Sequence, residues 1–180
     1  MGLLRATAEN GLYATVEDEW SRQCVDFGED FQEYATPSMT HAREIIYDRP
    51  CLTYGIYVLR RADHHDCLAH CNVARLPATT GVTLRTVWAL LAPRFDFQDP
   101  NQDELADIAA DLVTETLRLA EGGNEPGMAA DHVKIHFNGT ADRRYFAGAA
   151  HVLQRAGTLR DVAIRGNWLH MSIVNGLTRR

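Results

Sequence analysis

A strand-to-helix junction in the middle of the chain constrains the fold most. Thr83–Leu91 reads as a strand, and a long amphipathic helix follows it from about Asp99. Such junctions commonly bind phosphate, because the first helical N–H groups are unpaired and the helix dipole favours anions. Here the junction contains no glycine, and its helix opens with a run of acids: Asp99, Asp103, Glu104, Asp107 and Asp111. The layout is that of a cofactor site, whereas the residue types oppose a phosphate. Caps and dipole stabilisation would also explain these acids.

Length and composition predict one soluble domain spanning residues 1–180. Charged residues make up 23% of the chain and apolar residues 46%, which is ordinary for a globular protein. No apolar run approaches the roughly 20 residues that a membrane span needs, and no signal peptide is evident, so we expect a cytoplasmic protein without a membrane partner. The net charge of −6 and the scattered basic residues argue against nucleic acid as a partner.

Four cysteines and several histidines raise the question of a metal site. His64, His65, Cys67, His70 and Cys71 lie within eight positions of one another, as zinc ligands often do. In a strand, however, Cys67 and Cys71 share one face while His70 points to the other. The Cα atoms of Cys67 and Cys71 would be about 13 Å apart, too far for a disulfide. We therefore predict a buried strand with reduced thiols and no metal.

Hydrophobic periodicity predicts the order of the elements in the N-terminal half. A first helix is expected from Val16 to about Phe31, with Thr15 as its cap. A short helix follows Thr36-Pro37 and ends before Asp48. Three closely spaced strands then indicate an antiparallel meander. They are Tyr54–Arg60, Cys67–Leu76 and Thr83–Leu91, with a turn at Asp63–Asp66 between the first two.

The C-terminal half alternates helices and strands. Asp99, Pro100 and Gln102 resemble a capping box for the long helix, which ends at Gly122-Gly123. The remaining elements are a strand at His132–Phe137, a helix at Ala141–Gln154, and strands at Leu159–Arg165 and Trp168–Val174. A strand–helix–strand step requires one parallel pair at the centre of the sheet. We therefore predict an α+β (three-layer α/β) fold, with a mixed, largely antiparallel central sheet and helices on both faces.

This order of elements resembles the GNAT superfamily of acyl-CoA N-acyltransferases over nearly the whole chain. The family's early strand would come from Leu3–Ala8 or Leu12–Thr15. Its glycine-rich pyrophosphate loop has no counterpart in Pro93–Pro100. Its Asn-x-x-Ala-x-x-apolar-Tyr pattern is matched in spacing at three positions, with Arg144 at the usually apolar one. The three are Asn138, Ala141 and Tyr145.

The resemblance implies roles for particular residues. Tyr145 would protonate the leaving thiolate of acetyl-CoA or another acyl thioester, and Asn138 would hold backbone near the cofactor. The backbone of Leu91, Ala92 and the residues up to Arg94 would pair with the pantetheine arm, where two strands splay apart.

Other candidates come from the residues themselves. His136, two positions before Asn138, could act as a general base, although a partly exposed strand histidine is the simpler reading. Arg143 and Arg144 could grip a phosphate or an acidic carrier protein, but solvated arginines are the default.

Two functions follow from this reading. The first is a divergent N-acyltransferase that moves an acyl group from coenzyme A or an acyl carrier to a small-molecule amine. The second is a non-catalytic GNAT-like domain that binds a ligand or another subunit. The missing glycine loop and the absence of a carboxylate in Thr83–Leu91 favour the second. Exposed sheet edges would permit a homodimer. Either reading requires a V-shaped cleft between the segments around Trp88 and Ile135.

Overall fold

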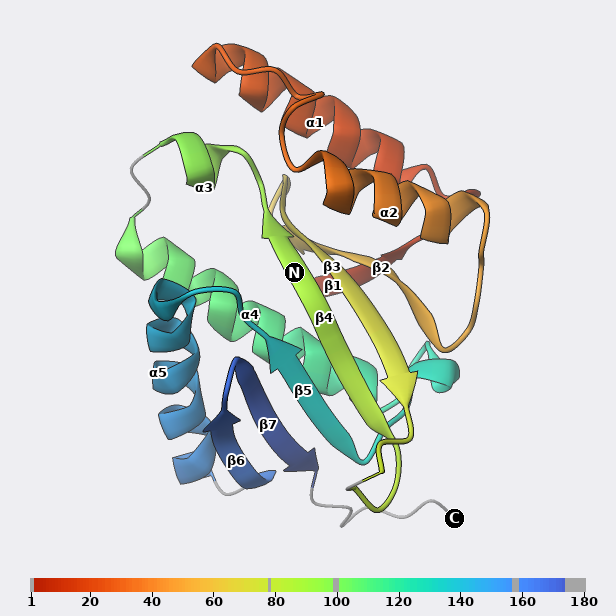
Figure 1. Ribbon diagram of the computed structural model, residues 1–180, viewed down its shortest axis with the longest axis vertical. Coiled ribbons are helices and arrows are strands. Elements are labelled where there is room, and N and C mark those ends of the chain that lie inside the picture. Colours follow the sequence, from red (N-terminus) through yellow and green to blue (C-terminus); the bar gives the residue numbers. More distant parts are fainter. Residues whose placement is uncertain (1, 78, 99–100, 157–158, 174–180) are drawn as a thin grey trace.

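One seven-stranded sheet organises the described part of the chain, with helices on both of its faces (Figure 1). The computed structural model describes residues 2–77, 79–98, 101–156 and 159–173. The strand order is β1-β2-β3-β4-β5-β7-β6, and every neighbouring pair is antiparallel except β4 and β5. The predicted α+β class with a mixed, largely antiparallel sheet is therefore confirmed. The strands are β1 (Gly2–Ala6), β2 (Tyr54–Arg61), β3 (His64–Ala74), β4 (Thr83–Leu91), β5 (His132–His136), β6 (Leu159–Arg165) and β7 (Trp168–Ile173).

The helices form the two outer layers. Figure 1 shows α1 and α2 over one face of the sheet and α4 and α5 over the other. The helices are α1 (Leu12–Phe27), α2 (Thr36–Tyr47), α3 (Arg94–Phe97), α4 (Gln102–Ala120) and α5 (Thr140–Ala156), with a short 3₁₀ turn at Pro126–Met128. The sequence did not predict α3 or the 3₁₀ turn. None of the helices in the described segments is long and apolar enough to cross a membrane.

The first helix begins and ends earlier than the sequence predicted. It starts at Leu12, after Gly11, rather than at Val16, and it ends at Phe27, before Gly28, rather than near Phe31. Both glycines have positive φ, at 63° and 77°, a conformation that glycine adopts without a steric penalty. The Asn10 side chain accepts a hydrogen bond from the N–H of Leu12 at 3.1 Å. The helix boundaries are thus set by backbone conformation rather than by the apolar stripe.

Two buried hydrogen bonds fix the α1 layer to its neighbours. The indole N–H of Trp20, a fully buried residue, donates to the carbonyl of His65 at 2.8 Å. The hydroxyl of Tyr13 donates to the carbonyl of Met39 at 2.8 Å. Each bond satisfies the polar tip of an otherwise apolar side chain. Together they attach α1 to β3 and to α2.

The meander is confirmed, but its first turn is tighter than predicted. His64–Asp66 belongs to β3, and the chain reverses at Ala62 and Asp63, with Ala62 at a φ of 50°. The predicted turn at Asp63–Asp66 is therefore wrong. β3 ends at Ala74, two residues before the predicted end. The expected early strand is β1, which pairs antiparallel with β2.

The two central strands pair at one end and separate at the other. β4 and β5 are matched from Thr83 with His132 to Thr86 with Ile135. The register of β3 against β4 skips at the same point, where Cys71 faces Thr86 and His70 faces Trp88, so that Val87 is an extra residue. Such a bulge bends and twists its strand. Beyond it β4 continues to Leu91 unpaired with β5, which produces the predicted V-shaped opening (Figure 1).

Asparagine caps the long helix α4. The side chain of Asn101 accepts from the N–H of Asp103 at 3.0 Å. Asn101 therefore acts as the cap in place of the predicted box, whose Asp99 and Pro100 lie outside the described residues. The helix ends at Ala120, close to the predicted Gly122-Gly123, and Gly122 has a φ of 85°.

A buried aspartate connects the meander to α3 and α4. Asp66, only 2% exposed, is the extra residue in β3 where Leu59 faces Cys67 and Arg60 faces His65. Its carboxylate accepts from the guanidinium of Arg94 at 3.0 Å and lies 3.7 Å from that of Arg61. Arg94 also contacts Glu104 at 2.9 Å, and Arg61 contacts Asp111 at 3.1 Å. Alternating charges therefore run from the sheet to the first half of α4.

Replacing Asp66 with asparagine should destabilise the fold. Loss of the buried charge leaves two arginines with one acid fewer, and we expect the free energy of unfolding to fall by about 2–3 kcal/mol. Urea denaturation followed by circular dichroism measures the change. Glu17→Gln is the control, because its partner Arg43 is 62% exposed and the pair should contribute less than about 1 kcal/mol. Equal losses in the two variants would contradict a central role for Asp66.

Candidate functional site

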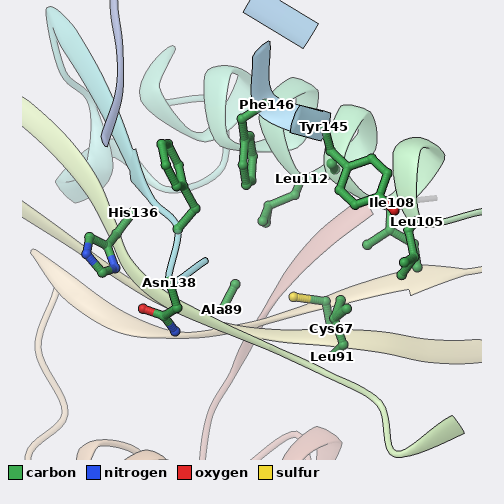
Figure 2. Close-up of a pocket in the computed structure, with 12 residues that line it drawn as sticks. Cys67, Ala89, Leu91, Leu105, Ile108, Leu112, His136, Asn138, Tyr145 and Phe146 are labelled. Atoms are coloured by element: carbon green, nitrogen blue, oxygen red, sulfur yellow. The ribbon is translucent and has the colours of Figure 1, made fainter. Parts of the chain in front are cut away.

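A largely apolar cavity of about 110 Å³ occupies the opening between β4 and β5 (Figure 2). Its walls come from the end of β4, the end of β5, one face of α4, the first half of α5 and one residue of β3. The lining residues are Cys67, Ala89, Leu91, Leu105, Ile108, Ala109, Leu112, His136, Phe137, Asn138, Tyr145 and Phe146. The three polar side chains among them, those of His136, Asn138 and Tyr145, come from β5, the segment after it and α5.

Helical periodicity produces the α4 wall. Leu105, Ile108, Ala109 and Leu112 are spaced at i, i+3, i+4 and i+7, so they project from one side of the helix. Figure 2 shows the labelled leucines and isoleucine of this set reaching toward the cavity. The same residues pack α4 on the sheet, and the cavity remains where the sheet has opened beneath them.

The end of β5 places one polar and one aromatic group at the cavity. Alternation along the strand puts His136 on the opposite face from Phe137. The imidazole of His136 packs on the indole of Trp168, with ring centroids 4.8 Å apart. The ring of Phe137 stacks on Phe146 of α5 at 5.5 Å. Phe137 therefore lies on the face of the sheet that α5 covers, and His136 projects from the opposite face.

The hydroxyl of Tyr145 connects the two helices that cover the cavity. It donates to the side-chain carbonyl of Gln102 in the first turn of α4 at 2.6 Å. Figure 2 shows the Tyr145 ring beside Leu105 and Ile108. The hydroxyl group is thus held at the rim of the cavity, close to the start of α4.

Backbone groups of β4 form another part of the opening. The N–H of Ala92 donates to the carbonyl of Asp66 at 2.9 Å, toward β3. Because peptide groups alternate along a strand, those of Leu91 and Ala89 face the opening instead. The carbonyl of Leu91 accepts from the hydroxyl of Tyr34 at 2.8 Å. The β4 edge from Val87 to Leu91 therefore offers backbone groups that an extended ligand could pair with.

The structure brings four of the seven predicted site residues together. Leu91, His136, Asn138 and Tyr145 all line the cavity. The other three are not among its lining residues. Ala92 is buried and paired to β3, Arg94 forms ion pairs with Asp66 and Glu104, and Arg143 is exposed in the first turn of α5.

Sequence reasoning missed several residues of the site. The α4 wall could have been inferred from its apolar spacing. Gln102, Tyr34 and Phe146 carry no local signal for their roles, because each acts through a partner distant in the chain.

The acids at the start of α4 are partly neutralised within the protein. Glu104 pairs with Arg94, and Asp111 pairs with Arg61. Burial raises the pKa of Asp111, and the Arg61 guanidinium opposes that rise. The N–H of Asp103 is already capped by Asn101. A phosphate at this helix start would therefore have to displace an internal acceptor, and Arg94 is already engaged.

The thiols of the central strands are buried and inert. Burial raises the pKa of Cys67 and of Cys71 to about 12, so both are protonated at neutral pH. Cys71 lies 3.6 Å from the hydroxyl of Thr86, and Cys67 lines the cavity. Among the residues that the structure describes, no group of three or more His, Cys, Asp or Glu side chains could hold a metal.

Comparison of the chain with protein-family models, with curated proteins and with solved structures gave no match. The functional argument therefore depends on the geometry of the cleft and on the chemistry of the residues around it.

A buried histidine lies on the other face of the sheet. His70 is 9% exposed, and its ring lies 5.3 Å from that of His41 and 5.8 Å from that of Trp88. Burial, together with the neighbouring His41 and Arg85, lowers the pKa of His70 to about 4. The imidazole is therefore neutral at pH 7.

His70 should make stability depend on pH. Its folded pKa lies below the value of about 6.5 expected in the unfolded chain, so only the unfolded chain takes up this proton between about pH 4 and 6.5. The contribution of neutral His70 to the free energy of unfolding is fully present above pH 6.5. It falls as the pH drops toward 4, by up to about 3 kcal/mol. Urea denaturation at pH 7.5 and pH 5 should show a smaller loss for His70→Phe than for the wild type. Equal losses would refute the assignment.

Proposed function

We propose that the chain is a divergent GNAT-like N-acyltransferase, which moves an acyl group from a thioester to a small-molecule amine. The observation that carries the proposal is the opening of the parallel β4–β5 pair into an apolar cavity with the Tyr145 hydroxyl at its rim. The order of the strands and helices supports it, since it agrees with the topology that the GNAT resemblance implies. Acetyl-CoA or another acyl thioester is the donor under this proposal.

The cleft suits a thioester arm better than a charged ligand. The amide groups of a pantetheine arm would pair with the backbone of Ala89 and Leu91, as a further strand would. The acyl group and the sulfur would enter the apolar cavity, which excludes water from the thioester. A volume of about 110 Å³ has room for a short acyl group, such as acetyl or butyryl.

The proton transfers can be assigned to two residues. The amine nitrogen attacks the thioester carbonyl and forms a tetrahedral intermediate, and His136 accepts the proton that the nitrogen loses. The carbon–sulfur bond then breaks, and the leaving thiolate takes the proton of the Tyr145 hydroxyl. Gln102, which accepts a hydrogen bond from this hydroxyl in the free protein, would be released at that step. His136 then releases its proton to solvent, and solvent restores the proton of Tyr145.

The start of α4 favours a donor that does not place a pyrophosphate there. Asn101 caps the helix, and Arg94 is engaged by Asp66 and Glu104. An acyl carrier protein presents its thioester on a phosphopantetheine arm with a single phosphate. Arg143 and Arg144, both exposed on α5, could contact that phosphate or the acidic carrier itself.

The same observations keep a second function open, that of a non-catalytic GNAT-like domain. The capped helix and the absence of a carboxylate on β4 are what a domain that only binds its ligand or partner would show. Such a domain would bind a thioester without consuming it. Binding and turnover therefore have to be measured separately.

Thioester binding should raise the melting temperature. A ligand at 100 times its Kd adds about 2.7 kcal/mol, or about 5–10 °C for a chain of this size. Acetyl-CoA, butyryl-CoA, free coenzyme A and a butyryl carrier protein should be compared by differential scanning fluorimetry. Ala109→Leu fills the cavity and should abolish the shift from the acyl group. Ala110→Leu, on the exposed side of the same helix, is the matched control. No shift with any donor would exclude the proposal.

Tyr145→Phe should slow acyl transfer. Loss of the proton donor should lower kcat by about 10²-fold and leave KM for the thioester nearly unchanged. Release of free thiol from the donor, with a panel of primary amines as acceptors, measures the rate. Tyr47→Phe is the control, since Tyr47 is 46% exposed and lies on α2. A wild-type rate in Tyr145→Phe would contradict the role of Tyr145 as the proton donor. Thioester binding without thiol release in the wild type would favour the non-catalytic function.

A further inference from the structure

A second cavity, of about 320 Å³, lies between α2 and strands β2 to β4. It shares no lining residue with the cavity in the cleft. Its polar lining consists of His41, Arg49, Thr53, His70, Asn72 and Arg85. Apolar side chains complete the lining, those of Ile45, Tyr54 and Val73, and unlike the cleft cavity this one is lined by charged side chains.

The charge of this cavity is one-sided. Arg49 and Arg85 line it, and no aspartate or glutamate does so among the described residues. The Nε of Arg85 donates to the side-chain carbonyl of Asn72 at 2.8 Å, which orients the guanidinium and leaves its two terminal amino groups for another acceptor. Within the described part of the chain, neither arginine takes part in an ion pair. The cavity therefore favours an anion.

His70 supplies an independent sign of a missing ligand. More than nine-tenths of the residue is buried, it lines the cavity, and its Nδ1 has no hydrogen-bond partner in the structure. A buried polar atom without a partner is destabilising, so such atoms are rare unless a ligand or water satisfies them. His41 lies next to it at 5.3 Å and also lines the cavity. Two imidazoles and two guanidiniums thus surround one space.

The cavity lies across the sheet from the cleft. Trp88 of β4 packs against His70 and His41, whereas the next residue, Ala89, lines the cleft cavity. Adjacent residues of a strand face opposite sides of the sheet. The two cavities therefore lie on opposite faces of the sheet.

We infer that this second cavity binds a carboxylate-bearing amine of amino-acid size, with Arg85 and Arg49 holding the carboxylate and His70 accepting or donating one further hydrogen bond. The planar fork of an arginine matches a carboxylate through two parallel hydrogen bonds. A volume of about 320 Å³ has room for a ligand of amino-acid size. That the ligand carries an amine and serves as the acyl acceptor rests on the proposed function; binding of its carboxylate does not.

Binding of free amino acids tests the inference without any thioester. Isothermal titration with a panel of L-amino acids and the corresponding L-amino acid amides compares ligands that differ only in the carboxylate. At least one amino acid should bind about 10–100-fold more tightly than its amide, the loss expected for a charge-assisted pair. Arg85→Met and Arg49→Met should each remove most of that difference. Arg22→Met, exposed on α1, should leave it unchanged.

Three results would overturn the inference. They are equal affinity for acids and amides, undiminished preference in both folded arginine variants, and tighter binding of phosphoethanolamine than of any amino acid. The last would reassign the cavity to a phosphate.

Failure here is distinguishable from failure of the acyltransferase proposal. Amino-acid binding without any response to thioesters would support this inference and contradict the acyltransferase proposal. A response to thioesters without amino-acid binding would support the acyltransferase proposal and contradict this inference.

Discussion

The half-paired parallel strands β4 and β5 are the constraint on which the rest of the structure depends. Hydrogen bonding holds them together only as far as Thr86 and Ile135, and the extra residue Val87 turns β4 away from β5 at that point. A sheet normally closes such a gap, because unpaired backbone groups are unfavourable when buried. Here α4 and α5 cover the gap with apolar side chains without filling it. The cavity is thus a consequence of strand register.

A second bulge explains how two acids of α4, Glu104 and Asp111, are paired within the protein. The extra residue at Asp66 places a carboxylate among the guanidiniums of Arg61 and Arg94, which in turn contact Asp111 and Glu104. Each guanidinium contacts one carboxylate on the sheet and one on α4, so these acids of α4 are paired within the protein. In the sequence these acids suggest an obstacle to phosphate binding. In the structure they attach α4 to the sheet. Removing Asp66 would leave both guanidiniums with one acid fewer, which is destabilising.

The elements were predictable where turn residues bound an apolar segment. β4 and β6 have the predicted bounds because Gly81 precedes the first and Gly166 follows the second in the sequence. The α1 boundaries were wrong because Gly11 and Gly28 adopt positive φ, which the apolar stripe does not reveal. In the site, residues near the ends of β4 and β5 could be placed from topology. The engagement of Arg94 could not, since Asp66 is distant in sequence and reaches it only through a bulge.

The two cavities place strict demands on any reaction between their ligands. They lie on opposite faces of one sheet, and a continuous sheet would separate them by a full layer of backbone. β4 has no partner on its β5 side beyond Thr86, so the sheet is not continuous at this point. Trp88 and Ala89 are consecutive, yet each contacts the surroundings of a different cavity. Under the proposed function, the amine and the thioester would therefore meet within the plane of the sheet. His136 lies at that edge on the face opposite Phe137, which is where a base for an amine arriving from the α2 side has to be.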